Sequence, residues 1–256
     1  MTANTIKFKP LKFYIDGITN LLEKLYSTSS RNPLEMLVDD LWCEFGQKHP
    51  FPLSKKEREI IFEATSLYGE AVYCYPFEDI LGPIYMELAG RGHKKAMGQF
   101  FTPTSVCELM ASLTLHDASA EIEQRAKKNE SIKICEPCCG AGAILMAAIK
   151  NIYSNNPALL PYVEIWGVDK ERLCARMCGA QILCNLMIHK VSLGILAIVW
   201  GDALTVEEYE TICFAEHKDR KPYAAIERFK MLQECINIQN HWKSKQSSQP
   251  VFPIAL

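Results

Sequence analysis

The sequence predicts an α/β protein in which a helical region precedes a mainly parallel β-sheet. Three observations carry this prediction. Up to about Gly90, apolar residues recur at the three- and four-residue steps of amphipathic helices. From about Ser131, short β-rich runs alternate with helical segments, which is typical of βαβ units. One of these runs ends in an acidic residue and continues through two glycines into a helix, a turn that lets a ligand approach the backbone.

Three amphipathic helices are expected in the first 90 residues. Their apolar positions are Phe13, Ile15, Ile18, Leu21, Leu22 and Leu25, then Leu34, Leu37, Val38, Leu41 and Trp42, then a run over 60–72. Pro33 suits the first turn of the second helix. Ser54 followed by Glu57 indicates a capping box at the start of the third. We therefore expect residues 1–90 to form a helical bundle that packs on the rest and carries no catalytic residue.

Three strands are expected in a core that extends over residues 91–223. They are marked by Ile132 and Ile134, by Val163, Ile165 and Val168, and by the run from Ile195 to Val199. Beyond Asp202 the pattern weakens, with a short strand indicated at 212–215 and a helix at 224–240. Residues 224–256 are therefore expected to form a C-terminal helix and tail.

Length and composition fit a globular protein of one large domain, or one domain with a sizeable appendage. The 256 residues include 28 Lys and Arg against 30 Asp and Glu, which gives a formal net charge of −2, and 48% of them are hydrophobic. These values exclude a disordered or collagen-like chain. The balanced charge also gives no basic domain that would by itself indicate a nucleic-acid partner.

The sequence favours a cytoplasmic protein without membrane contact. Its eleven cysteines are odd in number and scattered, which indicates a reducing compartment rather than a disulfide framework. The N-terminus lacks the apolar run and the small-residue cleavage site of a secretory signal. The longest apolar stretch, from Val191 to Trp200, is about half of the roughly 20 residues that a membrane helix needs.

Acidic residues end all three expected strands. Glu136 ends the first and precedes Gly140 and Gly142, Asp169 ends the second, and Asp202 ends the third. A carboxylate at the carboxyl end of a strand can hold an ammonium group, ribose hydroxyls or an adenine amino group. Each acid alone could simply be solvated at a strand end. Three in this order favour a nucleotide-like ligand.

Four short motifs in family order identify a resemblance. GQFFTP at 98–103, EPCCGAG at 136–142, GVD at 167–169 and GDAL at 201–204 resemble the N6-adenine DNA methyltransferases, especially the modification subunits of type I restriction systems. The segment Asp79–Tyr85 is similar to the lead-in of those subunits, so the match covers about residues 76–204. The resemblance implies a Rossmann-like, S-adenosylmethionine-dependent methyltransferase core with S-adenosylmethionine as cofactor.

The resemblance also implies how the cofactor is held. It places Glu136, Gly140 and Gly142 around the methionine part, Asp169 at the ribose and Asp202 at the adenine. The full set of cofactor-binding residues that it implies is Phe101, Thr102, Pro103, Glu136, Pro137, Gly140, Gly142, Asp169 and Asp202.

The sequence departs from the family at the catalytic motif, Asn/Asp-Pro-Pro-Tyr/Phe. In the family this motif accepts hydrogen bonds from the target amino group and stacks its aromatic ring on the flipped base. This sequence contains no Pro-Pro pair, and the nearest remnant is Asp219, Pro222 and Tyr223 in DRKPY. Two functions therefore stay open. One is a DNA adenine-N6 methyltransferase or its cofactor-binding part, and the other is a catalytically inactive regulatory or partner protein derived from that family.

The expected sheet is smaller than the seven-stranded sheet of the family. Three or four strands would leave one edge of the sheet open, and an open edge invites pairing with another chain. We therefore expect a homo- or hetero-oligomer, formed through elements after Asp202. The resemblance implies DNA as the substrate and a separate specificity or complementing subunit as the partner.

Other cysteines and one histidine have competing interpretations. Cys135 and Cys138 with Cys139 resemble half of a zinc or redox site, but no second Cys/His pair stands at matching spacing. We expect Cys174, Cys178 and Cys184 to be small buried hydrophobes. His93 lies in a short basic run that could meet phosphate or could be a solvated loop.

Overall fold

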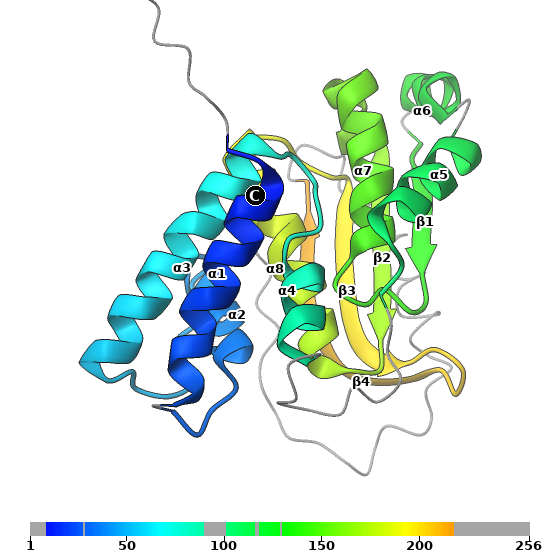
Figure 1. The fold of residues 1–256 in the computed structure, drawn as a ribbon. Coiled ribbons are helices and arrows are strands. Elements are labelled where there is room, and N and C mark those ends of the chain that lie inside the picture. The colour runs from blue at the N-terminus through cyan, green and yellow to red at the C-terminus, as the bar shows by residue number, and fades with distance from the viewer. Residues whose placement is uncertain (1–8, 28, 90–100, 116–117, 129, 218–256) are drawn as a thin grey trace, which may run out of the picture.

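The structure is a computed structural model that describes residues 9–27, 29–89, 101–115, 118–128 and 130–217. Its first four helices are α1 (Leu11–Tyr26), α2 (Pro33–Cys43), α3 (Lys55–Cys74) and α4 (Leu81–Leu88) (Figure 1). The three predicted helices are confirmed. Pro33 occupies the first turn of α2, where the Asn32 side chain accepts a hydrogen bond from the backbone N–H of Leu34.

The predicted capping box at the start of α3 is also confirmed. The backbone N–H of Glu57 donates to Ser54 Oγ at 3.3 Å, and the backbone N–H of Ser54 donates to Glu57 Oε2 at 2.8 Å. Arg31 adds an ion pair to the same carboxylate at 3.1 Å. These bonds to the ionised form lower the pKa of Glu57 to about 2, and the backbone N–H of Ser54 is the largest cause.

Four strands form one sheet in the order β1-β2-β3-β4. Their bounds are β1 (Ile132–Glu136), β2 (Val163–Asp169), β3 (Ile195–Asp202) and β4 (Glu207–Glu216). The first three are parallel, as the βαβ pattern predicts, because α7 (Ala143–Asn155) with the 3-10 helix η2 (Pro157–Tyr162) and then α8 (Arg172–His189) connect them. The expectation of a mixed α/β fold with helices at its N-terminal end is confirmed.

The fourth strand is longer than the sequence pattern indicates, and it runs the other way. A short turn after Asp202 brings β4 back along β3 as an antiparallel hairpin with two register shifts. The pattern marks only 212–215 because the first half of β4, Glu207–Thr211, is mostly polar and partly exposed. Within the described sheet, β4 is therefore the edge beyond β3 and β1 is the opposite edge.

The helical region and the sheet share one hydrophobic core. Helix α8 lies between α1–α4 and the sheet (Figure 1), and its side chains are buried along almost its whole length. Polar contacts join the two parts as well: Trp42 Nε1 donates to the carbonyl of Arg176 at 3.2 Å, and the Arg176 guanidinium pairs with Asp39 at 2.8 Å. The predicted boundary near residue 90 and the C-terminal part 224–256 lie outside the described residues.

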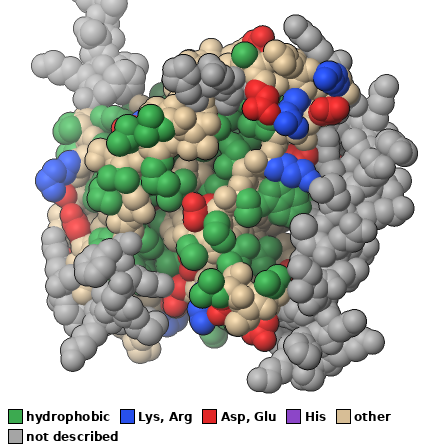
Figure 2. Space-filling model, turned by 90° about the vertical axis from the view of Figure 1, so that its right-hand side faces the viewer, with side chains coloured by type: hydrophobic (Ala, Val, Ile, Leu, Met, Phe, Trp, Pro, Cys, Tyr) green, Lys and Arg blue, Asp and Glu red, His purple; other side chains and the backbone are tan. Residues whose placement is uncertain are grey.

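Helices α5 (Thr104–Thr114) and α6 (Ala118–Lys127) lie beside α7 on the β1 side of the sheet (Figure 1). Small residues of α5, Cys107 and Ala111, pack against Ala147 of α7. The opposite side of α5 exposes four apolar side chains at helical spacing, and Figure 2 shows hydrophobic side chains gathered on this face of the molecule. The four are Val106, Leu109, Met110 and Leu113. No helix in the described part of the chain is long and apolar enough to cross a membrane.

Candidate functional site

A tight turn at 139–142 connects β1 to α7 at the carboxyl edge of the sheet. Gly140 and Gly142 have φ values of +54° and +99°, in the region that L side chains rarely adopt. The turn closes on itself, since the Gly142 N–H donates to the Cys139 carbonyl at 2.8 Å. The Cys139 N–H donates to the Val168 carbonyl of β2 at 2.9 Å, so the turn is also fastened to the neighbouring strand.

The two glycines leave space for different neighbours. A Cβ at Gly140 would lie 3.1 Å from a ring carbon of Phe101, whereas a Cβ at Gly142 would lie 2.9 Å from Cys178 Sγ and 3.3 Å from its Cα. The absence of a side chain at Gly140 therefore allows the Phe101 ring to lie close to the turn. Gly142 allows α8 to pack under the turn.

Phe101 lies beside the glycine turn. Its ring lies between Gly140 and Tyr85 of α4, whose ring centroid is 5.1 Å away. Thr102 is half-buried next to it, and Pro103 is exposed and immediately precedes α5. Tyr85 is a neighbour that the sequence argument placed only in the lead-in segment. Burial, then the negative charges near it, raise the pKa of Tyr85, and Asp169 is one of those charges.

Asp169 holds the turn and the start of the next loop at the same time. Its Oδ2 accepts from the Gly140 N–H at 2.7 Å, and its Oδ1 accepts from the Glu171 N–H at 2.8 Å. The side chain is largely buried, and this desolvation raises its pKa although both hydrogen bonds act in the opposite direction. Each carboxylate oxygen keeps a second lone pair, so the group can still accept a bond from a ligand.

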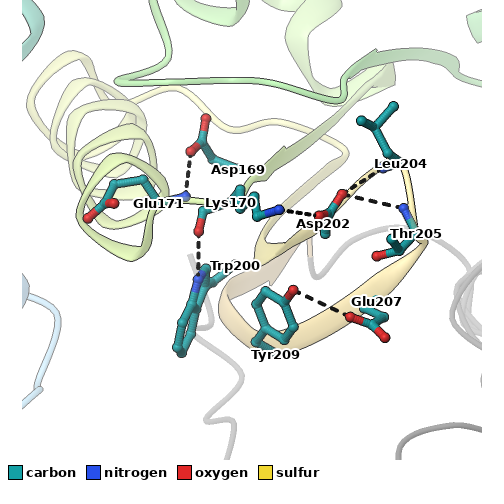
Figure 3. A network of polar contacts seen from close by, with 9 residues as sticks. All are labelled: Asp169, Lys170, Glu171, Trp200, Asp202, Leu204, Thr205, Glu207 and Tyr209. Atoms are coloured by element: carbon teal, nitrogen blue, oxygen red, sulfur yellow. Dashed lines mark hydrogen bonds and ion pairs between the residues drawn. The ribbon is translucent and has the colours of Figure 1, made fainter. Parts of the chain in front are cut away.

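Asp202 is paired within the protein, and Figure 3 shows this network. Its Oδ2 accepts from Lys170 Nζ at 2.7 Å, and its Oδ1 accepts from the Leu204 N–H at 2.9 Å. The Lys170 contact is the main reason why the pKa of Asp202 is lowered. Trp200 Nε1 donates to the Lys170 carbonyl at 3.0 Å and so steadies the backbone from which the lysine extends.

Glu136 completes the row of acids at the carboxyl ends of β1, β2 and β3. It is half-buried, and its Oε1 accepts from the Cys138 N–H at 3.2 Å, while Pro137 between them is exposed. The Cys138 thiol is within electrostatic reach of all three acids. After burial, Asp169, Glu136 and Asp202 are among the causes that raise its pKa. Because β1, β2 and β3 are neighbouring parallel strands, their carboxyl ends lie along the same edge of the sheet as the glycine turn.

Sequence reasoning missed the residues that support this site. Lys170 directly follows Asp169 and would have been recognisable only by its pairing with Asp202. Gln181 lies inside α8, where nothing in the local pattern separates it from its apolar neighbours, yet it reaches the carbonyl of Ala141. Both contacts depend on how elements that are distant in the sequence pack together.

The alternative sites have different outcomes. The remnant Asp219, Pro222 and Tyr223 and also His93 lie outside the described residues. Cys135 and Cys138 are exposed while Cys139 is buried, and within the described ranges no three His, Cys, Asp or Glu side chains are grouped so that they could hold a metal ion. The prediction for α8 is confirmed, because Cys174, Cys178 and Cys184 are buried.

One family model and two individual proteins match parts of this chain. Residues 77–228 match the family described as N-6 DNA Methylase. A type I restriction enzyme MpnII methylase subunit from Mycoplasma pneumoniae is 26% identical over 151 residues, which are 58% of this chain and 23% of that subunit. A solved structure of a class I S-adenosylmethionine-dependent methyltransferase from Listeria monocytogenes aligns with 73% of this chain and 52% of its own, at 16% identity and a TM-score of 0.42.

Proposed function

The chain belongs to the family of N-6 DNA methylases, and we propose that it binds S-adenosylmethionine at the glycine turn. The observation that carries the proposal is the assembly of Phe101, Gly140 and Asp169 into one unit. The Gly140 N–H donates to the buried Asp169 carboxylate at 2.7 Å, and a Cβ at Gly140 would lie only 3.1 Å from the Phe101 ring. A flat ring and an acceptor beside bare backbone suit a nucleoside with an amino-acid tail.

The acids would each hold a different part of the cofactor. Asp169 would accept hydrogen bonds from the ribose hydroxyls through its remaining lone pairs, while its bonds to Gly140 and Glu171 keep it oriented. Glu136, with Pro137, Gly140 and Gly142, would surround the methionine part, whose ammonium group a carboxylate can neutralise. Thr102 and Pro103 would continue the wall that Phe101 begins.

Asp202 would accept a hydrogen bond from the adenine amino group only after its bond to Lys170 is broken. In the structure its Oδ2 is bound to Lys170. The lysine side of this ion pair is largely exposed, so Lys170 can turn toward solvent when a ligand takes its place at Asp202.

We further propose that this chain binds the cofactor but transfers methyl groups poorly when it acts alone. The cofactor, when bound, supplies an activated methyl group for transfer to the exocyclic nitrogen of adenine. The target amino group needs acceptors that orient it, and positioning of this kind supplies several kcal/mol of the barrier. The family's Pro-Pro motif for this task is absent from the sequence. Rapid methyl transfer by the chain alone would therefore mean that Asp219, Pro222 and Tyr223 orient the target amino group.

The relative named above is a subunit of a restriction enzyme, which supports a proposal about partners. We propose that the chain acts on DNA together with a separate specificity or complementing subunit. The aligned part covers 23% of that relative. We assign the recognition of a DNA sequence to the specificity subunit. The sequence pattern assigned association to elements after Asp202, of which the structure describes β4, an edge strand of the described sheet. The exposed apolar side of α5 is a second surface that association would cover.

Two measurements test these proposals. Calorimetry should show one S-adenosylmethionine or S-adenosylhomocysteine site per chain, and absence of binding would refute the cofactor proposal. Transfer of labelled methyl groups to adenine-containing DNA should be slow or undetectable with the chain alone. Fast transfer that is lost in Asp219→Ala or Tyr223→Ala would refute the second proposal, while binding without any transfer, with or without partner subunits, would favour a regulatory protein.

Light scattering tests the association. The chain should form a dimer or a larger complex at high micromolar concentration, and Leu109→Lys on the exposed side of α5 should weaken this association. A monomer at that concentration, together with no change of binding to candidate subunits in Leu109→Lys, would contradict the proposal.

A further inference from the structure

Gln181 makes an unusual set of contacts for a side chain in the middle of a helix. It is fully buried in α8, and its amide group reaches two other parts of the molecule. Nε2 donates to the Ala141 carbonyl and to Asp79 Oδ1, both at 2.8 Å. Oε1 accepts from the backbone N–H groups of Ile80 and Leu81, at 2.8 Å and 3.0 Å.

The orientation of this amide is determined by its partners. Two N–H donors face the oxygen, and two acceptors face the nitrogen, so the reversed amide would meet like groups on both sides. Asp79 is itself held by the Gly82 N–H, which donates to Oδ1 at 2.8 Å. The network is buried, and each of its donors faces an acceptor, so breaking it would leave buried polar groups without hydrogen bonds and lower the stability of the fold.

The same network connects the glycine turn to the start of α4. Gln181 binds the carbonyl of Ala141, the residue between Gly140 and Gly142, and it also binds the backbone where α4 begins. One turn further along α4, Tyr85 packs against Phe101, and Phe101 packs against Gly140. The positions of the glycine turn and of the Tyr85 and Phe101 rings therefore both depend on the Gln181 side chain.

We infer that Gln181 is a positioning residue for the cofactor site, which it serves by holding the Ala141 peptide and α4 in a fixed relation. The inference rests on the proposed function, because it concerns the same site. It extends that proposal to the helical N-terminal region, whose last helix becomes a structural part of cofactor binding. Gln181 is fully buried and acts through the Ala141 peptide and α4, without touching the ligand.

Asn185 offers a matched control one turn along the same helix. It is also fully buried, and its Oδ1 accepts from the Phe77 N–H at 2.6 Å, while its Nδ2 donates to the Gln181 carbonyl at 2.8 Å. It thus binds the segment before α4 in a similar way, but its side-chain hydrogen bonds go to Phe77 and Gln181 and not to the glycine turn. Asn185→Asp and Gln181→Glu replace equivalent amides with a carboxyl of the same shape.

The test compares the two variants in S-adenosylmethionine binding and in thermal unfolding. At pH 7.5, Gln181→Glu should raise Kd at least tenfold, since a carboxyl at this position cannot donate to both the Ala141 carbonyl and Asp79. Asn185→Asp should lower the unfolding temperature comparably but change Kd less than threefold. An equal loss of affinity in both variants, or wild-type affinity in Gln181→Glu, would overturn the inference.

A pH profile separates positioning from general loss of stability. When protonated, the introduced carboxyl of Gln181→Glu can donate one hydrogen bond again, so its Kd should fall toward the wild-type value as the pH is lowered. Gln181→Met has no such proton, and its loss should be independent of pH. A flat profile for both variants would count against the inference. The titratable groups around this position are Asp79, which binds Gln181, and the groups that interact electrostatically with Asp79, namely Glu78, Tyr68, Cys107 and Cys174.

Hydrogen exchange in the ligand-free protein keeps the inference testable even if the wild-type chain binds no cofactor. The amide protons of Gly140 and Gly142 are bonded to Asp169 and to the Cys139 carbonyl. Gln181→Glu, or Gln181→Met if the first variant does not fold, should speed the exchange of both amides at least tenfold, and Asn185→Asp should leave it unchanged. Unchanged exchange in a folded Gln181 variant would refute the positioning role, whereas absence of cofactor binding by the wild type would refute only the proposed function.

Discussion

Gly140→Ala tests directly whether the glycine turn is the cofactor site. Alanine at φ +54° costs roughly 1–2 kcal/mol of folding free energy, because its Cβ crowds the backbone in this region. Its Cβ would also lie 3.1 Å from the Phe101 ring, which must move away. Phe101 is only half-buried, so we expect it to shift without a large further loss of stability. The wall of the site would then be displaced.

Gly46 separates these two effects. It has a comparable left-handed φ of +83°, but a Cβ there would meet no atom within 4 Å. In Gly46→Ala only the backbone cost remains, so both variants should lose about 2–8 °C of unfolding temperature, at roughly 2–4 °C per kcal/mol for a chain of this size. Only Gly140→Ala should also lose affinity for S-adenosylmethionine. We expect a loss of at least tenfold, or about 1.4 kcal/mol.

Calorimetric titration of both variants and thermal unfolding followed by circular dichroism measure these quantities. Wild-type affinity in a Gly140→Ala protein that shows the expected loss of stability would place the cofactor elsewhere. Loss of affinity in Gly46→Ala as well would mean that binding follows global stability, and the geometric argument for Phe101 would fail.

Further expectations concern the neighbours of the turn and one distant cap. Gly142→Ala should destabilise the fold more than the Gly46 control, because the added Cβ meets the side chain and backbone of α8 at 2.9 Å and 3.3 Å; an equal unfolding temperature would contradict this. Asp169→Ala should weaken cofactor binding by about 1.5–3 kcal/mol, as expected for hydrogen bonds to a charged group, and a change below about threefold in calorimetry would mean that the acid serves the fold alone. Lys170→Met should raise the pKa of Asp202 toward its ordinary value of 3.8, as carboxyl-carbon NMR can measure, and an unchanged pKa would assign the lowering to the backbone N–H groups. Glu57→Gln should lower stability at neutral pH, because the folded pKa of about 2 lies below the ordinary value of 4.5. This difference from the wild type should be largest above pH 4.5 and shrink as the pH falls toward about 2 in acid-unfolding experiments, and a difference that keeps its neutral-pH size at pH 2 would refute the assignment.

Local sequence patterns predicted the helices and strands because each depends on near neighbours along the chain. The apolar period of 11–26, the proline in the first turn of α2 and the Ser54–Glu57 box all act within one or two helical turns. The glycine turn was recognisable for the same reason. A strand that ends in an acid and then meets two glycines can be read from one short segment. The order of the motifs was sufficient to indicate the family.

The direction and the length of β4 could not be predicted from the local sequence pattern. A strand that pairs at a sheet edge tolerates polar residues on its exposed side, and so Glu207–Thr211 carries little apolar signal. Its antiparallel direction follows from a turn of only a few residues after Asp202, which is too short for the crossover that a parallel strand needs.

The partners of the site residues were decided only by the tertiary structure. Asp169 binds the N–H of Gly140, Asp202 binds Lys170, and Gln181 links Ala141 to Asp79. Each of these pairs joins groups about 30 to 100 residues apart. Such contacts arise when buried polar groups must find partners in whichever elements the packing brings near, and no local pattern specifies which elements those are. The sequence alone therefore determined which residue types stand at the strand ends, while packing of α4 and α8 against the sheet decided how those residues are held.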